Sequence, residues 1–298
     1  MEKYLFSYAT PDDPPIKRSL IRIVEKVSGQ PKLKKLYLEN QRAPRPSESF
    51  WQAAVRSLDL DVRFDPEALA RAPASGPLVI VANHPYGVLD GIVIAWLASK
   101  IRNDFVVLTN AVLMRTPEVR NHILPINFSG TREARNTNVA SRASAREVLG
   151  RGGIVVVFPA GGVSTAPDRM GRRPAVDARW QPFVAQLIQK SEATVLPIWF
   201  DGQNSRLFQV ASHLSATLRL SLIFHEVRAR MGTTLGVMVG RPIPFCELSA
   251  ISDRQVLADH LRAVTYALSN HNRSVDPESA LGRGFLRKLK RLSFARAA

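Results

Sequence analysis

The sequence has a single cysteine, Cys246, and no apolar run long enough to cross a bilayer. One cysteine excludes an intrachain disulfide and a cysteine-rich metal site. The most apolar region, residues 77–98, is interrupted by polar, proline and glycine residues, so it lacks the roughly 20 consecutive apolar residues that a membrane span needs. The first four residues begin no apolar signal core. We therefore expect a cytoplasmic protein, at most peripheral on the inner face of the membrane.

Acidic residues are scarce: 25 Asp and Glu stand against 41 Lys and Arg, giving a net charge of +16. Most of this excess lies at the two ends of the chain. Residues 15–44 hold eight basic and two acidic residues, and residues 281–298 hold six basic and none acidic, so 12 of the 16 charges lie there. Because the region between is nearly neutral, we predict a basic helical segment at 1–45, a domain at 46–280 and a basic tail at 281–298.

Both basic ends are also amphipathic. One helical stripe in the first segment comprises Ile16, Leu20, Ile23, Val24 and Val27. Such a helix either lies in the interface of an anionic membrane or packs its stripe against the domain. The tail mixes apolar and basic residues in the same way, and an acidic carrier protein is a second partner that the charge would suit.

Basic ends also suit nucleic acid. The sequence, however, contains no helix-turn-helix signature, zinc motif or aromatic–basic RNA-binding motif, and its central region offers no broad basic face. We therefore expect no nucleic-acid partner.

Short apolar runs alternate with helical patterns from residue 77 onward. The predicted strands are 78–82, 105–108, 123–126, 154–158, 194–200 and 235–239. The predicted helices are 88–99, 139–149, 182–190, 218–231 and 253–268. This alternation predicts an α/β fold with a mixed, largely parallel β-sheet flanked by helices. Ligands of such sheets bind where strands end and loops begin.

The loop after the first of these strands carries a histidine and a carboxylate. His84 and Asp90 are separated by a Pro/Gly turn, which can bring the two side chains together. The carboxylate would then fix the imidazole tautomer while the other ring nitrogen removes a proton. Alternatively, His84 is a turn residue and Asp90 caps the following helix. The histidines of predicted helices (His213, His225 and His260) are interpreted as structural.

Two further strand ends have unusual loops. In 158–164, Gly161 and Gly162 allow backbone amides to approach an anion or a developing oxyanion, unless the loop is a plain tight turn. In 200–205, Asn204 and Ser205 can hydrogen-bond an acceptor, and Ser205 can equally be a helix N-cap.

Taken in order, these loops resemble the lysophospholipid acyltransferase superfamily, which includes the 1-acylglycerol-3-phosphate acyltransferases. Asn83-His84 through Asp90 is similar to the first block of that family, Phe-Pro-Ala-Gly at 158–161 to its Phe-Pro-Glu-Gly block, and Val-Leu-Pro-Ile at 195–198 to its Val-Pro block. Gly-Arg-Pro-Ile-Pro at 240–244 resembles its Gly-x-Pro-Ile strand exit.

The chain also departs from that pattern. Five residues rather than four separate His84 from Asp90, and Ala160, Val163 and Phe128 stand where the family has charged residues. This form resembles the bacterial hemolysin-like branch, whose members include lyso-ornithine lipid acyltransferases. If the chain recognises a substrate phosphate, the task has moved to other arginines, unless these are solvated loop residues. The candidates are Arg132, Arg135, Arg172 and Arg173.

The resemblance implies a membrane-associated O-acyltransferase of phospholipid biosynthesis or related lipid metabolism. It would move a fatty acyl group from acyl-CoA or acyl-carrier protein to the hydroxyl of a lysophospholipid or lyso-aminolipid, with His84 as general base oriented by Asp90. It implies no metal and no cofactor beyond this co-substrate. The implied substrate-binding residues are Asn83, Tyr86, Gly87, Arg132, Arg135, Pro159, Gly161, Gly162, Ser164, Asn204 and Ser205.

Two alternatives concern activity. The chain can be a non-catalytic or degenerate lipid-binding protein of the same fold, because fold does not determine function. An α/β-hydrolase lipase is disfavoured because no Gly-x-Ser-x-Gly nucleophile elbow occurs in the sequence.

Overall fold

A computed structural model describes residue 7 and residues 14–110, 117–127 and 131–269. The predicted tail at 281–298 lies outside these residues. The strands are β1 (Asp61–Arg63), β2 (Leu78–Ala82), β3 (Phe105–Asn110), β4 (Ile123–Ile126), β5 (Ile154–Val157), β6 (Thr194–Phe200) and β7 (Thr234–Val239). The helices are α1 (Pro15–Ser28), α2 (Gln30–Arg42), α3 (Phe50–Ser57), α4 (Pro66–Ala70), α5 (Val88–Ile101), the 3₁₀ helix η3 (Pro117–His122), α6 (Arg132–Gly150), α7 (Phe183–Ser191), α8 (Arg206–Leu214), α9 (Ala216–Arg230), α10 (Phe245–Leu248) and α11 (Arg254–Ala267).

The strands form one seven-stranded sheet in the order β1-β7-β6-β2-β5-β3-β4. Neighbouring strands are parallel except β6 and β7, which are antiparallel. Every residue of β2 is buried, as expected for a central strand covered on both faces. The predicted α/β fold with a mixed, largely parallel sheet is therefore confirmed.

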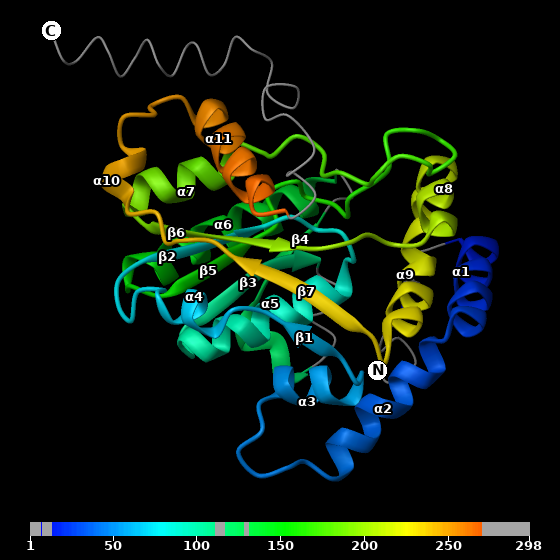
Figure 1. The fold of residues 1–298 in the computed structure, drawn as a ribbon. Coiled ribbons are helices and arrows are strands. Elements are labelled where there is room, and N and C mark those ends of the chain that lie inside the picture. The colour runs from blue at the N-terminus through cyan, green and yellow to red at the C-terminus, as the bar shows by residue number, and fades with distance from the viewer. Residues whose placement is uncertain (1–6, 8–13, 111–116, 128–130, 270–298) are drawn as a thin grey trace, which may run out of the picture.

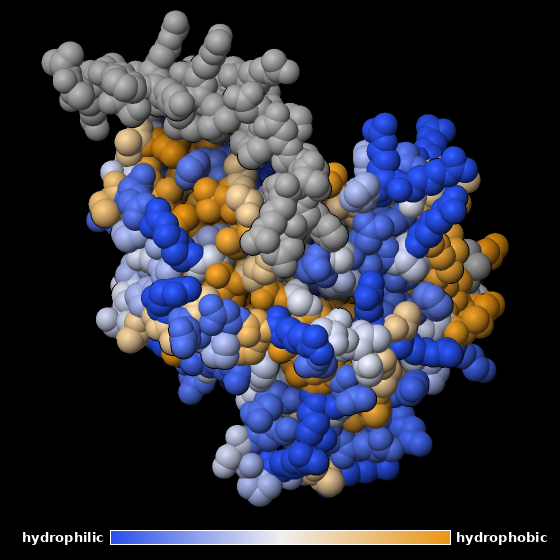
Figure 2. Space-filling view, viewed as in Figure 1, coloured by the Kyte–Doolittle hydropathy of each residue, from blue (hydrophilic) through white to orange (hydrophobic). Residues whose placement is uncertain are grey.

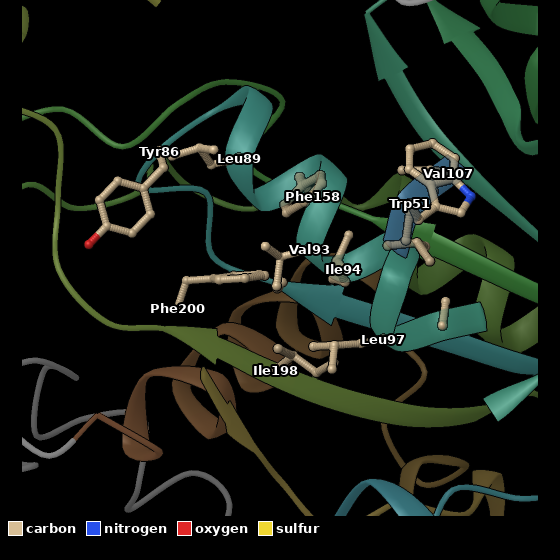
Figure 3. Close-up of a cluster of buried hydrophobic side chains, with 14 of the residues drawn as sticks. Trp51, Tyr86, Leu89, Val93, Ile94, Leu97, Val107, Phe158, Ile198 and Phe200 are labelled. Atoms are coloured by element: carbon tan, nitrogen blue, oxygen red, sulfur yellow. The ribbon is translucent and has the colours of Figure 1, made fainter. Parts of the chain in front are cut away.

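Helices cover both faces of this sheet (Figure 1). Alternate residues of β2 point to opposite sides, so Leu78 and Ile80 join the core beneath α3, α5 and α9, whereas Val79 and Val81 join the core beneath α6, α7 and α11. Figure 3 shows the first of these cores, in which side chains of α5 lie alongside Ile198 and Phe200 of β6. The two cores hold β2 and its carboxyl end in a fixed position.

The six predicted strands and five predicted helices are all present. The main difference in bounds is at α6, which begins at Arg132 rather than at residue 139 because the Thr131 side chain accepts a hydrogen bond from the Ala134 N–H at 3.1 Å and caps the helix. Pro125 is tolerated within β4 because β4 is an edge strand. The sequence patterns did not predict the short strand β1, whose pairing with β7 is set by tertiary contacts.

The N-terminal segment forms two helices that meet at Gly29, where φ is +101°. Helix α1 packs against α9: Ile21 is buried, and the Ser28 hydroxyl donates to the Ser221 carbonyl at 3.2 Å. Ile16, Ile23 and Val27 of the predicted apolar stripe are 86%, 61% and 76% exposed.

These three residues of the stripe therefore do not pack on the domain, whereas Val24 is half-buried and the face with Ile21 and Ser28 contacts α9. Apolar atoms gather on the edge of the molecule where α1 lies (Figure 2). None of the helices in the described ranges is long and apolar enough to cross a membrane.

Candidate active site

A cavity of about 330 Å³ lies where β2, β3 and β5 end. Of the residues predicted from the sequence, His84, Gly87, Pro159, Gly161 and Gly162 line it. Apolar side chains of the two cores and of α9 form most of the remaining wall. The cavity therefore joins the first two predicted loops at the carboxyl edge of the parallel strands, where ligands of α/β folds bind.

His84 lies on this wall, close to the buried Asp90. The distance from His84 Nδ1 to Asp90 Oδ2 is 3.0 Å, and the Asp90 side chain is fully buried. Nδ1 nevertheless makes no well-formed hydrogen bond, and such bonds are often poorly aligned in catalytic pairs before substrate binds. Because Nδ1 faces the carboxylate, Nε2 is the ring nitrogen left for a substrate.

Asp90 also caps α5. Its Oδ2 accepts hydrogen bonds from the backbone N–H groups of Tyr86 at 2.8 Å and Gly87 at 2.9 Å. Asp90 therefore makes both of the contacts that the sequence allowed, since one oxygen contacts the imidazole and caps the helix. Burial raises the pKa of Asp90, and the contacts with His84 and the two amides oppose that rise.

The loop after β5 holds His84 in place. The His84 ring stacks on Phe158 with ring centroids 4.1 Å apart. The His84 carbonyl accepts a hydrogen bond from the Ser164 N–H at 2.8 Å, and the His84 N–H donates to Asp177 Oδ1 at 3.2 Å. These contacts fix the imidazole in plane and position, which reduces the entropy lost when it meets a substrate.

Asp177 is a buried carboxylate that the sequence did not reveal. It accepts hydrogen bonds from the Ser164 hydroxyl at 2.5 Å and from the Trp180 indole at 2.9 Å, in addition to the His84 N–H. Its own N–H donates to the Tyr266 hydroxyl at 2.7 Å, which ties the loop to the end of α11. No periodicity or motif marks Asp177, because all its partners except Trp180 come from other segments of the chain.

The two glycines of the second loop differ in their hydrogen bonding. The Gly161 N–H donates to the Phe158 carbonyl at 3.0 Å and closes a tight turn. Among the described residues the Gly162 N–H has no such acceptor, and a side chain at this position would meet nothing within 4 Å. Gly162 is thus the residue of the pair that has a backbone donor free at the cavity.

Other predicted binding residues support the loops instead of lining the cavity. The Asn83 side chain donates to the Phe200 carbonyl at 2.9 Å and accepts from the Phe200 N–H at 2.7 Å, which joins the ends of β2 and β6. The Tyr86 hydroxyl donates to the Asp201 carbonyl at 2.6 Å. Burial raises the pKa of Tyr86 to about 12, against the opposing charge of Arg230.

Ser164, Asn204 and Ser205 also lie off the cavity wall. Ser164 bonds Asp177, and Ser205 caps α8 by accepting from the Phe208 N–H, as its alternative interpretation predicted. The Asn204 side chain is buried, and its two polar atoms have no partner among the described residues. Polar residues at strand ends thus organise the loops here, which differs from the sequence prediction.

The arginines on the cavity wall are not those expected from the sequence. Arg132 and Arg135 are exposed at the start of α6. Arg172 and Arg173 are exposed in the loop after β5, where their backbone N–H groups donate to the Asp168 carboxylate. The cavity is instead lined by two other arginines, Arg142 of α6 and Arg219 of α9. They occur in predicted helices with no local signal of a site.

The fold and the site together define a class of protein: an α/β protein with an imidazole–carboxylate pair in a largely apolar cavity, arranged for general-base chemistry. In the described part of the chain, no group of three or more His, Cys, Asp or Glu side chains is placed to hold a metal ion. The acyltransferase family model matches residues 36–275, and the chain belongs to that family.

Two curated relatives and one solved structure are similar to the chain. The lyso-glycine lipid O-acyltransferase of Phocaeicola vulgatus is 25% identical over 74% of this chain and 77% of its own length. The lyso-glycine lipid O-acyltransferase of Bacteroides thetaiotaomicron is 24% identical over 77% of this chain and 83% of its own length. The crystal structure of the 1-acyl-sn-glycerophosphate acyltransferase PlsC from Thermotoga maritima aligns with a TM-score of 0.47 and 16% identity over 91% of this chain and 88% of that one.

Proposed function

We propose that this acyltransferase moves a fatty acyl group from a thioester donor to the hydroxyl of a lysolipid, with His84 as the general base. The observation that carries the proposal is the pairing of His84 Nδ1 with Asp90 Oδ2 at 3.0 Å on the wall of the cavity. Nδ1 facing the carboxylate leaves Nε2 as the proton acceptor, and the buried charge of Asp90 supports the imidazolium that forms.

The reaction proceeds without a covalent enzyme intermediate. His84 Nε2 takes the proton of the acceptor hydroxyl while its oxygen attacks the thioester carbonyl carbon. The tetrahedral intermediate then collapses, the carbon–sulfur bond breaks, and the imidazolium returns its proton to the leaving thiolate. The products are an ester and a free thiol, and no cofactor takes part beyond the donor, acyl-CoA or acyl-carrier protein.

The Gly162 N–H is the proposed donor to the oxyanion of that intermediate. Gly162 directly follows the turn that begins at Phe158, on which the His84 ring stacks. The base and the oxyanion donor thus lie on two loops that contact each other, so little rearrangement is needed when charge develops on the carbonyl oxygen.

The acceptor is proposed to be a lysolipid with an amino-acid headgroup. The names of both curated relatives specify a lyso-glycine lipid. Apolar side chains such as Leu108, Ile126 and Ile223 line the cavity and suit an acyl chain near the reacting hydroxyl.

Peripheral attachment to an anionic membrane is part of the proposal. The exposed stripe of α1 (Ile16, Ile23 and Val27) would enter the lipid interface. Helix α1 packs on α9, and α9 contributes Leu220, which is exposed and lines the cavity. The surface that would meet the membrane is thus supported by a helix of the cavity wall, and lysolipid would reach the cavity from the cytoplasmic leaflet.

The test is a transfer assay with purified full-length protein. Radiolabelled acyl-CoA and acyl-carrier protein are each combined with lyso-glycine lipid and lysophospholipids, for the wild type, His84→Ala and the control His213→Ala, whose histidine is exposed on α8. We expect His84→Ala to lose activity by about 10²–10⁴-fold with an unchanged circular dichroism spectrum, and His213→Ala to retain it. Near-wild-type transfer by His84→Ala would contradict the proposed base, and no transfer by the wild type would favour a lipid-binding role.

A further inference from the structure

Arg142 and Arg219 give the cavity a positive charge that no described residue of its wall balances. Both line the same cavity as His84, and no Asp or Glu is among the lining residues that the structure describes. The wall otherwise presents apolar side chains, backbone and neutral polar groups. The half-buried guanidinium of Arg219 attracts an anion more strongly than the same group in bulk water, and exposed Arg142 adds a second positive charge.

Arg219 is half-buried and has no acidic partner among the described residues. Its Nη2 donates to the Val163 carbonyl, and its guanidinium lies 5.6 Å from the Phe208 ring centroid. Burial lowers the pKa of Arg219, as expected for a desolvated cation without a counter-charge. An unpaired charge in such a place is unfavourable for the fold, so the position fits a role in binding an anion.

Arg142 reaches the cavity from α6. Its guanidinium lies 4.6 Å from the ring centroid of Phe183, which also lines the cavity. Stacking on an aromatic face orients the planar group and leaves its edge N–H groups free for an acceptor. The described residues provide no carboxylate at ion-pair distance from it.

The chemistry of this pair identifies its ligand. A planar guanidinium presents parallel N–H groups that match the two oxygens of a carboxylate or of a phosphate. A glycine headgroup linked through its nitrogen ends in a carboxylate, whereas the phosphates of acyl-CoA belong to the donor. We propose that Arg142 and Arg219 form an anion subsite that binds the carboxylate of the acceptor headgroup, an inference that rests on the proposed lysolipid acyltransferase function.

The experiment measures binding separately from transfer. Equilibrium dialysis with the full-length His84→Ala protein compares lyso-glycine lipid with its methyl ester, which lacks the negative charge. Into this background we introduce, one at a time, Arg142→Gln, Arg219→Gln and Arg219→Lys. The matched control is Arg146→Gln, because Arg146 is an exposed arginine one turn along α6. Arg219→Lys keeps a positive charge near the Val163 carbonyl but loses the planar pair of N–H donors. Arg142 is exposed, so it can be changed with little risk to the fold.

We expect the free acid to bind at least about tenfold more tightly than the ester. Each Gln variant should weaken binding of the acid by about tenfold or more and leave binding of the ester unchanged, and Arg219→Lys should weaken it less than Arg219→Gln. Arg146→Gln should change neither. Equal Kd values for acid and ester would overturn the subsite, even if the wild-type enzyme transfers acyl groups.

A second arm separates acceptor from donor. With His84 restored, KM is measured for acyl-CoA and for the corresponding acyl-N-acetylcysteamine thioester, which has no phosphate. Suppose that the Arg→Gln variants raise the KM of acyl-CoA but not that of the phosphate-free thioester, and leave the KM values of the acid and ester acceptors unchanged. That result would assign the arginines to the donor and overturn the proposal. Retained discrimination between acid and ester in a protein that transfers nothing would refute the proposed function alone.

Discussion

Oδ1 of Asp177 accepts a hydrogen bond from the backbone N–H of His84 at 3.2 Å, across 93 residues of sequence. The same oxygen accepts from the Ser164 hydroxyl, whose backbone N–H bonds the His84 carbonyl. The loop after β5 therefore holds His84 through both its backbone N–H and its carbonyl. The position of the proposed base therefore depends on Asp177, a residue that does not line the cavity.

The first prediction concerns this relationship. Asp177→Asn replaces one acceptor oxygen by a donor and sets it against the donors of His84, Ser164 or Trp180. We expect kcat to fall by about tenfold to a hundredfold with little change in KM, and the free energy of unfolding to fall by about 1–3 kcal/mol. Steady-state kinetics and urea unfolding measure these changes.

Ser164→Ala is the matched control, because it removes a single donor from Asp177 and leaves the carboxylate in place. It should reduce kcat less than Asp177→Asn does. A larger effect of Ser164→Ala, or an unchanged kcat in Asp177→Asn, would show that this carboxylate does not position the base.

The second prediction tests the charge of Asp90. Asp90→Asn keeps an oxygen that can accept the Tyr86 and Gly87 N–H groups, so α5 retains its cap. It removes the negative charge beside His84 Nδ1, so the imidazolium is no longer supported. We expect kcat to fall by about 10²–10⁴-fold while the free energy of unfolding changes by less than about 1 kcal/mol. A fall in stability that parallels the loss of activity would instead indicate a purely structural role.

The third prediction compares two glycines near His84. Gly87 has a φ of +79°, and a Cβ there would lie 3.0 Å from Ile223 and 3.2 Å from Val163. Gly87→Ala should therefore destabilise the fold by about 1–3 kcal/mol. Gly91 lies in α5 with open space around its Cβ position, so Gly91→Ala should stabilise it by up to about 1 kcal/mol. Thermal unfolding of both variants checks the opposite signs, and equal signs would refute the backbone argument.

The sequence predicted the parts of the site whose chemistry is local. His84 and Asp90 were found because a strand, a turn and a helix start lie within a few residues, and the fold then brings the two side chains to 3.0 Å. The sequence did not reveal Asp177, Arg142 or Arg219, because contacts with other segments place them. Asp177 accepts a hydrogen bond from the His84 N–H, and Arg219 on α9 donates to the Val163 carbonyl. No local pattern encodes such contacts.

The same distinction explains why the sequence did not predict the roles of the polar loop residues. Asn83 and Ser205 are of types that bind substrates and also satisfy buried backbone groups, and the residue type alone does not separate these roles. The positions of Phe200 and Glu226 decide between them, because they provide the partners of Asn83 and Ser205. The overall α/β fold was predictable since it depends on the alternation of whole segments, which packing details do not change.

The fourth prediction concerns pH and stability. Burial lowers the pKa of His260 in α11 below its ordinary value of 6.5. The unfolded chain then binds more protons than the native state as pH falls, so the contribution of neutral His260 to stability is present above about pH 6.5 and is lost as pH falls through the native pKa. His260→Gln should flatten the dependence of the unfolding free energy on pH below about pH 6.5 relative to the wild type. Parallel pH dependences would contradict the assignment.

The fifth prediction tests the membrane surface. Ile23 and Val27 are exposed apolar residues of α1, and Lys26 is exposed beside them. The double variant Ile23→Asp/Val27→Asp should lower binding to vesicles that contain anionic lipid by tenfold or more, because it removes two apolar contacts and adds two negative charges. Flotation of full-length protein with neutral and anionic vesicles measures the effect.

The matched control is Val139→Asp, because Val139 is also a large exposed apolar residue, at 64%, but lies on α6 away from the stripe of α1. Transfer to a soluble short-chain lysolipid should stay close to wild type in all these variants, since none of the changed residues lines the cavity. If Val139→Asp lowers flotation as much as the α1 double variant, attachment depends on general surface polarity and charge. The exposed stripe of α1 would then have no specific part in bringing the enzyme to its lipid.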